Sequence, residues 1–389
     1  MSKIIFRKES FGGIFYEPKT GKFSYANQVA AEKKLTELGG GVVIHQNPLV
    51  EGCFLSAPEE IGIDITQECN LRCTHCYKDS STTEKNELTT KELFSIADQS
   101  AELGVFCFYL SGGEATCRKD LFDFVDYAKS KGIWSVLTTN GCYGKEIWDK
   151  IVKANFLKLQ ISVDGPKEIH DSIRGKGNFD RVIETIKYLK SSGVNLRINT
   201  HLCKINKDYA GEMVALANGL GVGIKFATVR PIGRYNNSDV VEMLTKKEFY
   251  ETIKIILELK KKYSAIQVIC DFDKLVAKES LYVLPGTDNS RCLAADKTMC
   301  IDSIGNVFPC SFFSPFKEFC GGNIREKSIV DIWSNSAVFK KFRVRKASPE
   351  CEECKFFKKS CNGGCPAIPA AVYGSPEKLD PTCPVECMR

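Results

Sequence analysis

The segment IGIDITQECNLRCTHCYKDSS, residues 61–81, places three cysteines directly after a short run of alternating isoleucines. Apolar residues at every second position are typical of a β-strand. The cysteines that follow, Cys69, Cys73 and Cys76, have the spacing Cys-x3-Cys-x2-Cys. A closed tetrahedral metal site uses four protein ligands, whereas three thiolates on a four-iron cluster leave one iron open. The segment therefore predicts a metal centre with an exchangeable position at the end of a strand.

Short apolar runs alternate with amphipathic stretches from this segment to about Arg230. Strands are expected at 61–65, 106–110, 135–138, 157–163, 196–201 and 223–229, and helices at about 90–103, 121–131, 145–154, 179–191 and 209–220. Consecutive strands separated by helices run parallel, and right-handed crossovers curl such a sheet toward a full or partial barrel. We therefore predict an α/β fold with a partial (β/α)6 TIM-like barrel over residues 58–240, and reactive side chains at the C-terminal ends of its strands.

Three further segments complete the predicted organisation. Residues 1–57 are expected to form a short α+β element, and residues 241–290 a helical bridge whose main helix lies at 245–263. Residues 291–389 are dense in cysteine and glycine. They predict a separate small domain that depends on metal clusters, because an apolar core alone would not hold it.

Composition limits the protein's surroundings and partners. The 389 residues contain no apolar stretch long enough to span a membrane, and the N-terminus lacks the pattern of a signal peptide. We therefore expect a cytoplasmic protein without a membrane partner. In that compartment 19 cysteines indicate metal ligation rather than disulfides. The net charge of +6 counts every cysteine as a neutral thiol, so it gives no argument for a nucleic-acid partner.

Polar motifs follow three other predicted strands. LSGGEATCRKD, with Gly112, Gly113 and Glu114, ends the second strand, TTNG ends the third, and ISVDGPKEIHDSIRG ends the fourth. Two glycines allow close approach of the backbone to a ligand, and a carboxylate can accept hydrogen bonds from an ammonium group. We expect these motifs to surround the metal centre.

The cysteine spacing, together with Gly-Gly-Glu one β/α unit later, resembles the radical S-adenosylmethionine superfamily. The resemblance implies that S-adenosylmethionine chelates the open iron of a [4Fe-4S] cluster and is cleaved to a 5′-deoxyadenosyl radical. It implies a set of cofactor-binding residues in which His75 lies against the adenine and Arg174 is a candidate for the carboxylate. The full set is His75, Gly112, Gly113, Glu114, Asn140, Ser162, Asp164, Arg174 and Asn199. A zinc site that takes His75 as its fourth ligand is the alternative for the loop alone.

The C-terminal cysteines are similar to those of a SPASM domain. Cys292 precedes Gly305-x4-Cys310, and the later series has six residues between its second and third cysteines where the family usually has five. The resemblance implies two auxiliary [4Fe-4S] clusters, hence three clusters in all. Cys351, Cys354, Cys361 and Cys383 would hold one, and Cys292, Cys310 and Cys365 would supply three ligands to the other.

The fourth ligand of the second auxiliary cluster stays open. Cys300 is favoured, because TMCIDSIGNVFPC predicts a hairpin that brings its strand beside Cys310. Cys320, Cys387 or a vacant position for a substrate thiolate are the alternatives. Two zinc ribbons would use similar spacings in this region.

Enzymes of this kind mostly modify peptides, and a minority act on tetrapyrrole side chains. The first hypothesis is a maturase that abstracts hydrogen from a residue of a ribosomally made precursor peptide and forms a thioether or another crosslink, with a flavodoxin- or ferredoxin-type reductant. The second is removal of a tetrapyrrole side chain, and the third is a non-catalytic zinc-binding scaffold. No catalytic residue can be named without the substrate.

The N-terminal element bears on the choice between these hypotheses. A hairpin is expected to turn at Thr20-Gly21, and a helix is expected over 28–38. This stretch resembles the opening of leader-recognition domains, which bind the leader of a precursor peptide as an extra strand. A truncated domain of that kind and a simple packing cap are the two interpretations.

Overall fold

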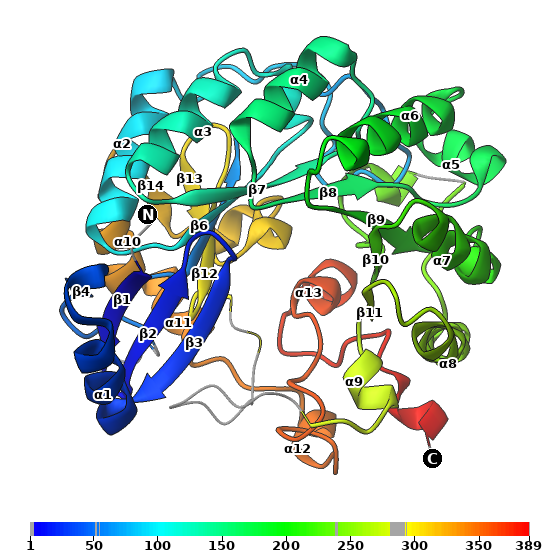
Figure 1. Cartoon of the computed structure of the whole chain (residues 1–389). Helices are drawn as coiled ribbons and strands as arrows, with labels where there is room; N and C mark the ends of the chain where they lie inside the picture. Colours follow the sequence, from blue (N-terminus) through cyan, green and yellow to red (C-terminus); the bar gives the residue numbers. More distant parts are fainter. Residues whose placement is uncertain are drawn as a thin grey trace.

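The computed structural model describes residues 4–50, 53, 55–237, 240–280, 292 and 294–388. Its centre is a curved ten-stranded sheet with the order β11-β10-β9-β8-β7-β6-β5-β12-β13-β14 (Figure 1). The six strands from β5 to β10 pair in parallel in sequence order, so the α/β barrel is confirmed. These strands are β5 Glu60–Asp64, β6 Cys107–Ser111, β7 Trp134–Thr139, β8 Lys158–Ser162, β9 Leu196–Leu202 and β10 Gly223–Thr228.

Helices cover the convex face of this sheet (Figure 1). The first begins with a capping box between Thr89 and Glu92, and it buries Leu93, Ile96 and Ala97 on one face. Apolar residues at this spacing explain why the predicted helices form. They are α2 Thr90–Glu102, α3 Leu121–Ser130, α4 Lys145–Ala154, α6 Asn178–Ser191, α7 Ala210–Gly219 and α8 Lys246–Lys262. One further helix, α5 Lys167–Arg174, was not predicted.

The region after residue 262 extends the barrel sheet at both edges. β11 Val268–Cys270 pairs in parallel with β10, and β12 Thr298–Ile301 pairs in parallel with β5. β12 then forms the predicted hairpin with β13 Asn306–Phe308, which pairs with β14 Gly322–Asn323. The helices of this region are α9 Asp273–Val276, α10 Ile329–Asn335, α11 Ala337–Arg343, α12 Pro349–Glu352 and α13 Ala367–Tyr373.

The first half of the C-terminal region shares the core of the barrel, in contrast to the separate small domain expected from the sequence. Met299 and Ile301 of β12 and Trp333 and Phe339 of the following helices belong to the same buried cluster as the barrel strands. The apolar residues of a strand as short as β12 carry no periodicity from which its parallel partner could be predicted. The segment with α12 and α13 lies across the opening of the curved sheet (Figure 1).

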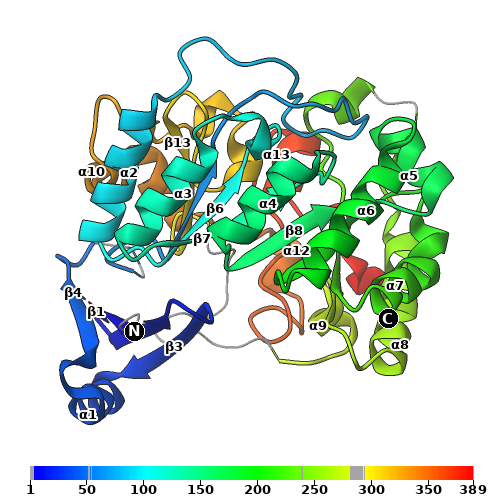
Figure 2. The same ribbon diagram turned by 45° about the horizontal axis from the view of Figure 1, so that its top comes forward.

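The N-terminal element is a four-stranded sheet that projects from one side of the barrel (Figure 2). The predicted hairpin and helix are present, and β1 and β4 are additional. The strand order is β3-β2-β1-β4, with β4 parallel to β1. The elements are β1 Ile4–Glu9, β2 Gly12–Glu17, β3 Lys22–Asn27, α1 Gln28–Leu38 and β4 Val42–Gln46.

A buried arginine fastens this element to the barrel. Arg7 pairs with Glu9 at 2.7 Å and donates to the carbonyls of Pro58 at 2.8 Å and Gly104 at 3.1 Å. Both carbonyls precede barrel strands, so the element contacts the end of the barrel opposite the C-terminal ends of the strands. No helix in the described ranges is both long and apolar enough to cross a membrane.

Candidate active site

The cysteine loop leaves β5 at the C-terminal end of the barrel. Cys69, Cys73 and Cys76 line one cavity of about 150 Å³. Burial raises the pKa of the Cys69 thiol to about 12, and it also raises the pKa of Cys73. Such thiols become ligands only when a bound cation replaces their protons. The three sulfurs therefore converge on one site that favours a metal cluster.

The Gly-Gly-Glu motif allows the cysteine loop to pack directly on the end of β6. Gly112 has φ +128°, and a Cβ atom there would collide with the carbonyl oxygen of Thr66. A Cβ atom at Gly113 would collide with the carbonyl oxygen of Glu68. In this close approach the Gly113 N–H donates to Thr66 at 2.8 Å, and the Glu114 N–H donates to Glu68 at 2.8 Å. The glycines therefore fix the position of the loop that carries the thiols.

Glu114 joins the end of β6 to the end of β7. Its buried carboxylate accepts from the Asn140 backbone N–H at 2.7 Å and from the Thr139 hydroxyl at 2.8 Å. Burial raises the pKa of this carboxyl, although these hydrogen bonds oppose the shift. The Asn140 side chain then donates to Asn70 of the cysteine loop at 2.7 Å. Three loops of the site are thus connected through Glu114 and Asn140.

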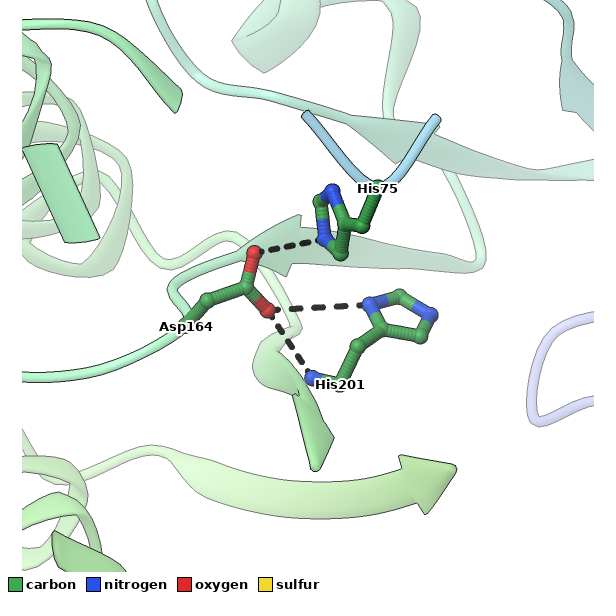
Figure 3. Close-up of side chains that lie close together, drawn as sticks. All are labelled: His75, Asp164 and His201. Carbon is green, nitrogen blue, oxygen red and sulfur yellow. Dashed lines mark hydrogen bonds and ion pairs between the residues drawn. The ribbon is translucent and has the colours of Figure 1, made fainter. Parts of the chain in front are cut away.

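Asp164 does not line the cavity, and its carboxylate contacts His75 and His201 (Figure 3) and also Arg174. One carboxylate oxygen lies 3.0 Å from His75 Nε2 and 2.5 Å from Arg174 Nε, and the other accepts from the His201 backbone N–H at 2.8 Å. Burial alone would raise the pKa of Asp164, but Arg174 and His75 outweigh it and hold this pKa well below its usual range. Arg174 Nη1 in turn lies 3.8 Å from Cys73 Sγ. A buried carboxylate therefore orients His75 of the cysteine loop and Arg174, which faces that loop.

Most of the predicted cofactor-binding residues line the same cavity as the three thiols. These are His75, Gly112, Gly113, Glu114, Asn140, Ser162 and Arg174. Two predicted residues do not line it. Asp164 is fully buried behind Arg174, and the Asn199 amide donates to Gln160 at 3.2 Å within the barrel. Contact of either residue with a cofactor remains a prediction.

Several residues that sequence reasoning missed also line this cavity. They are Tyr77, Lys78, His201, Arg230 and Phe312. His201 could have been predicted from the sequence. It lies two residues after Asn199 near the C-terminal end of β9, so the two side chains are on the same face of the strand. Tyr77 and Lys78 directly follow Cys76, whereas Arg230 and Phe312 come from distant segments: the ring centroids of Tyr77 and Phe312 lie 5.3 Å apart.

Gly233 and Arg234, in the segment RPIGR of residues 230–234, support the cysteine loop. Arg234 donates to the carbonyls of Cys73 at 2.8 Å and Ser80 at 2.7 Å. A Cβ atom at Gly233 would collide with the carbonyl oxygen of Tyr77. The sequence indicated only a loop here, and no periodic signal could have revealed these contacts.

The spacing of the thiols fits a cluster better than a single ion. Among the described residues, three potential ligand atoms lie within 4.8 Å of one another only at His75, Asp164 and His201. Three sulfurs around one zinc ion would lie about 3.8 Å apart, given Zn–S bonds of about 2.3 Å in a tetrahedron. The cysteine sets are wider than this, which agrees with a four-iron cluster. In the group of His75, Asp164 and His201, the Asp164 carboxylate is already paired with Arg174 and does not need a metal ion as its countercharge.

The C-terminal cysteines form two groups. Cys292, Cys310 and Cys365 line a second cavity of about 490 Å³, and Cys361 of the other group also reaches it. Burial raises the pKa of Cys310, and Cys292 and Cys365 raise it further, so the three sulfurs are neighbours. In the other group, burial raises the pKa of Cys361 to about 11, with added contributions from Cys351 and Cys354. Burial likewise raises the pKa of Cys383 to about 12, and Cys361 adds to it.

None of the three cysteines named as candidates for the fourth ligand, Cys300, Cys320 and Cys387, lines the second cavity. Cys300 is buried on β12, and its Sγ lies 3.7 Å from an Asp64 carboxylate oxygen inside the barrel. Cys320 donates to the carbonyl of Gly322 at 3.4 Å. The two ligand sets predicted for the auxiliary clusters therefore correspond to two neighbouring groups of cysteines, and the fourth ligand beside Cys292, Cys310 and Cys365 remains a prediction.

Comparison with known proteins adds independent findings. The model of the radical SAM superfamily matches residues 63–217, and that of the SPASM iron-sulfur cluster-binding domain matches residues 292–356. Mycofactocin maturase MftC of Mycolicibacterium smegmatis is 28% identical over 344 residues, which cover 85% of this chain and 83% of that protein. AdoMet-dependent heme synthase of Methanosarcina barkeri is 32% identical over 343 residues, which cover 84% of this chain and 97% of that protein.

A solved structure shares the fold over nearly the whole length. Streptococcus suis SuiB bound to S-adenosylmethionine superposes with a TM-score of 0.77 at 18% identity, over 97% of this chain and 98% of that chain. SuiB is also known bound to its precursor peptide SuiA, with a TM-score of 0.75. Because the superposition covers 97% of this chain, it includes the N-terminal sheet.

Proposed function

The chain belongs to the radical SAM superfamily and carries a SPASM iron–sulfur domain, and on this premise we propose that it matures a ribosomally made precursor peptide. It is an S-adenosylmethionine-dependent enzyme with [4Fe-4S] clusters. When bound, the cluster at Cys69, Cys73 and Cys76 supplies the electron that cleaves S-adenosylmethionine to a 5′-deoxyadenosyl radical. The proposed substrate then gives up a hydrogen atom from one of its residues.

The N-terminal sheet is the observation that carries the peptide proposal. Its outer strands, β3 and β4, each have one unpaired edge within the described part of the chain. On β4, the Val43 side chain is 39% exposed and Ile44 is 61% exposed. An extended peptide can add to such an edge as a further strand. The maturase relative and the superposition on SuiB, which binds a precursor peptide, support the same substrate class.

In this proposal, the residues around the thiols orient the cofactor. Arg174 is held by Asp164 beside Cys73, and its remaining N–H groups can donate to a carboxylate. His75 has a buried Nδ1 without a hydrogen-bond partner, and its ring lies at the same cavity. We expect Arg174 to bind the cofactor's carboxylate and His75 to bind its adenine.

The finer parts of the proposal concern the product and the partners. We propose a thioether or another crosslink as the product, and a flavodoxin- or ferredoxin-type protein as the electron donor. A cytoplasmic location is proposed because 19 cysteines and iron–sulfur clusters require a reducing compartment. The chemistry of the clusters supports these points.

The test is anaerobic purification followed by incubation with S-adenosylmethionine, a reductant and the short peptides encoded beside the gene. The protein should be brown with about twelve irons per chain, as expected for three four-iron clusters. A peptide should lose hydrogen by mass spectrometry while 5′-deoxyadenosine accumulates. A variant with alanine at Cys69, Cys73 and Cys76 should release no 5′-deoxyadenosine and keep about eight irons. A colourless protein with stoichiometric zinc would contradict the assignment of iron–sulfur clusters and radical chemistry.

The heme synthase relative favours a tetrapyrrole as the second candidate substrate. The same assay can include an iron porphyrin with propionate side chains. Loss of carboxyl groups from the porphyrin, with every tested peptide unchanged, would overturn the peptide proposal while leaving the radical chemistry intact.

A further inference from the structure

Arg230 lies between the two cavities of the active site. It follows β10 by two residues, and together with Phe312 it lines both the cavity of Cys69, Cys73 and Cys76 and the cavity of the auxiliary cysteines. Its side chain is 10% exposed. Nη1 donates to the carbonyl of Thr228 at 2.6 Å and also to its hydroxyl, and Cζ lies 4.7 Å above the Phe312 ring. The guanidinium group is therefore held in a fixed position.

The surroundings of Arg230 are predominantly acidic. Asp271 lies 3.6 Å from Nη2, and Asp380 lines the same cavity as Cys310 and Cys365. Burial by itself would lower the pKa of Arg230, but Cys365, Asp271 and Asp380 outweigh it and raise this pKa. Nε has no hydrogen-bond partner. A substrate carboxylate would meet two aspartates here, so the position favours a different task for the cation.

Arg230 is the one largely buried cation among the described residues that line the auxiliary cavity. The other basic side chain there, Lys274, is exposed to solvent. Thiolates that hold a cluster, and the cluster as a whole, add negative charge to this cavity. A positive charge stabilises the reduced state of a cluster, which is the more negative state. A buried positive charge does so much more strongly than a positive charge exposed to solvent.

We propose that Arg230 is the buried countercharge that raises the reduction potential of the auxiliary cluster held by Cys292, Cys310 and Cys365. Net charge around a cluster and hydrogen bonds near its sulfurs are what set such potentials. The inference needs the auxiliary cluster but no particular substrate, so it stands apart from the peptide proposal. Because Arg230 also lines the first cavity, it lies between the two predicted cluster sites.

The experiment is a redox titration followed by electron paramagnetic resonance. The background protein has alanine at Cys69, Cys73 and Cys76, so only auxiliary clusters contribute, and a further Cys310→Ala change identifies the signal in question. Arg230→Gln should shift its midpoint potential to more negative values. Arg230→Lys should give a smaller shift, because the charge is retained. Asp271→Asn should shift the potential in the positive direction, because it removes the anion beside Arg230.

Lys274→Gln is the matched control. It removes the same charge from the same cavity, but at an exposed position where solvent and salt screen it, so the potential should stay unchanged. An unshifted potential in Arg230→Gln with full iron content would overturn the inference, as would an equal shift in Lys274→Gln. If Arg230→Gln does not fold, the measurement is made on Asp271→Asn. The absence of a positive shift of the midpoint potential in that variant would also overturn the inference. Release of 5′-deoxyadenosine by the unmodified chain is measured separately and tests the proposed function.

Discussion

Arg174 Nε lies 2.5 Å from Asp164 Oδ2, and the exposed fractions of the two side chains are 8% and 0%. Arg174 faces the cavity and the Cys73 sulfur, whereas Asp164 lies behind it. The carboxylate therefore acts on the site through its neighbour. We therefore propose that Asp164 is a positioning residue, although it stands in a motif that resembles a cofactor-binding one.

Asp164→Asn should weaken cofactor binding and destabilise the fold together. The change preserves shape but leaves the buried Arg174 without its countercharge, and breaking a buried pair costs about 3–5 kcal/mol of unfolding free energy. Calorimetric titration with S-adenosylmethionine and urea unfolding measure the two effects. Asp149→Asn is the control, because its pair with Lys145 is exposed and worth about 1 kcal/mol or less. A folded Asp164→Asn protein with unchanged cofactor affinity would contradict the assignment.

His170 should make stability depend on pH between about 6.5 and 4. Burial lowers the pKa of this histidine to about 4, and its Nδ1 accepts from the Asp164 backbone N–H at 3.2 Å. In that window the unfolded chain binds a proton that the folded protein excludes, so the free energy of unfolding falls as pH falls. The loss should be on the order of 3 kcal/mol across the window.

Replacement by a residue that does not titrate isolates this contribution. The difference in urea midpoint between the wild type and His170→Gln should shift in favour of the variant from pH 7 to pH 4, because all other groups are shared. Parallel pH profiles of the two proteins would show that His170 is not responsible.

Local patterns predicted the barrel, because each of its strands and helices has its own apolar period. What they missed depends on distant contacts. β12 is four residues long and pairs Thr298 with Glu60, far away along the chain. α5 has eight residues, KEIHDSIR, and buries His170, Ile173 and Arg174, a set too polar to indicate a buried helical face.

The site divides in the same way. The cysteine spacing and the Gly-Gly-Glu motif were enough to predict most of the residues around the first cavity, because each motif lies within one short segment. The orientation of Asp164 away from the cavity, and the bonds from Arg234 to the carbonyls of the cysteine loop, arise where separate segments meet. The spacing of residues along one sequence contains no information on such contacts between distant segments.

Gly113→Ala should displace the cysteine loop and abolish release of 5′-deoxyadenosine. The added Cβ would meet the backbone carbonyl of Glu68, which cannot move without shifting the adjacent Cys69. We expect a loss of stability greater than about 1 kcal/mol and incomplete iron incorporation at the first cluster. Gly211→Ala is the control: this helical glycine has open space around its Cβ position, and alanine should stabilise the protein by about 0.5–1 kcal/mol. Normal cleavage by Gly113→Ala would mean that the close approach is dispensable.

Cys310→Ala and Cys300→Ala should differ in iron content. Cys310 lines the auxiliary cavity with Cys292 and Cys365, whereas Cys300 Sγ lies 3.7 Å from Asp64 inside the barrel. Loss of a sulfur from the cavity should remove one cluster, about four irons per chain. Cys300→Ala should keep its iron and lose only the packing of a small buried side chain. Anaerobic iron analysis on matched preparations decides the matter, and a loss of about four irons from Cys300→Ala would instead identify Cys300 as the fourth ligand.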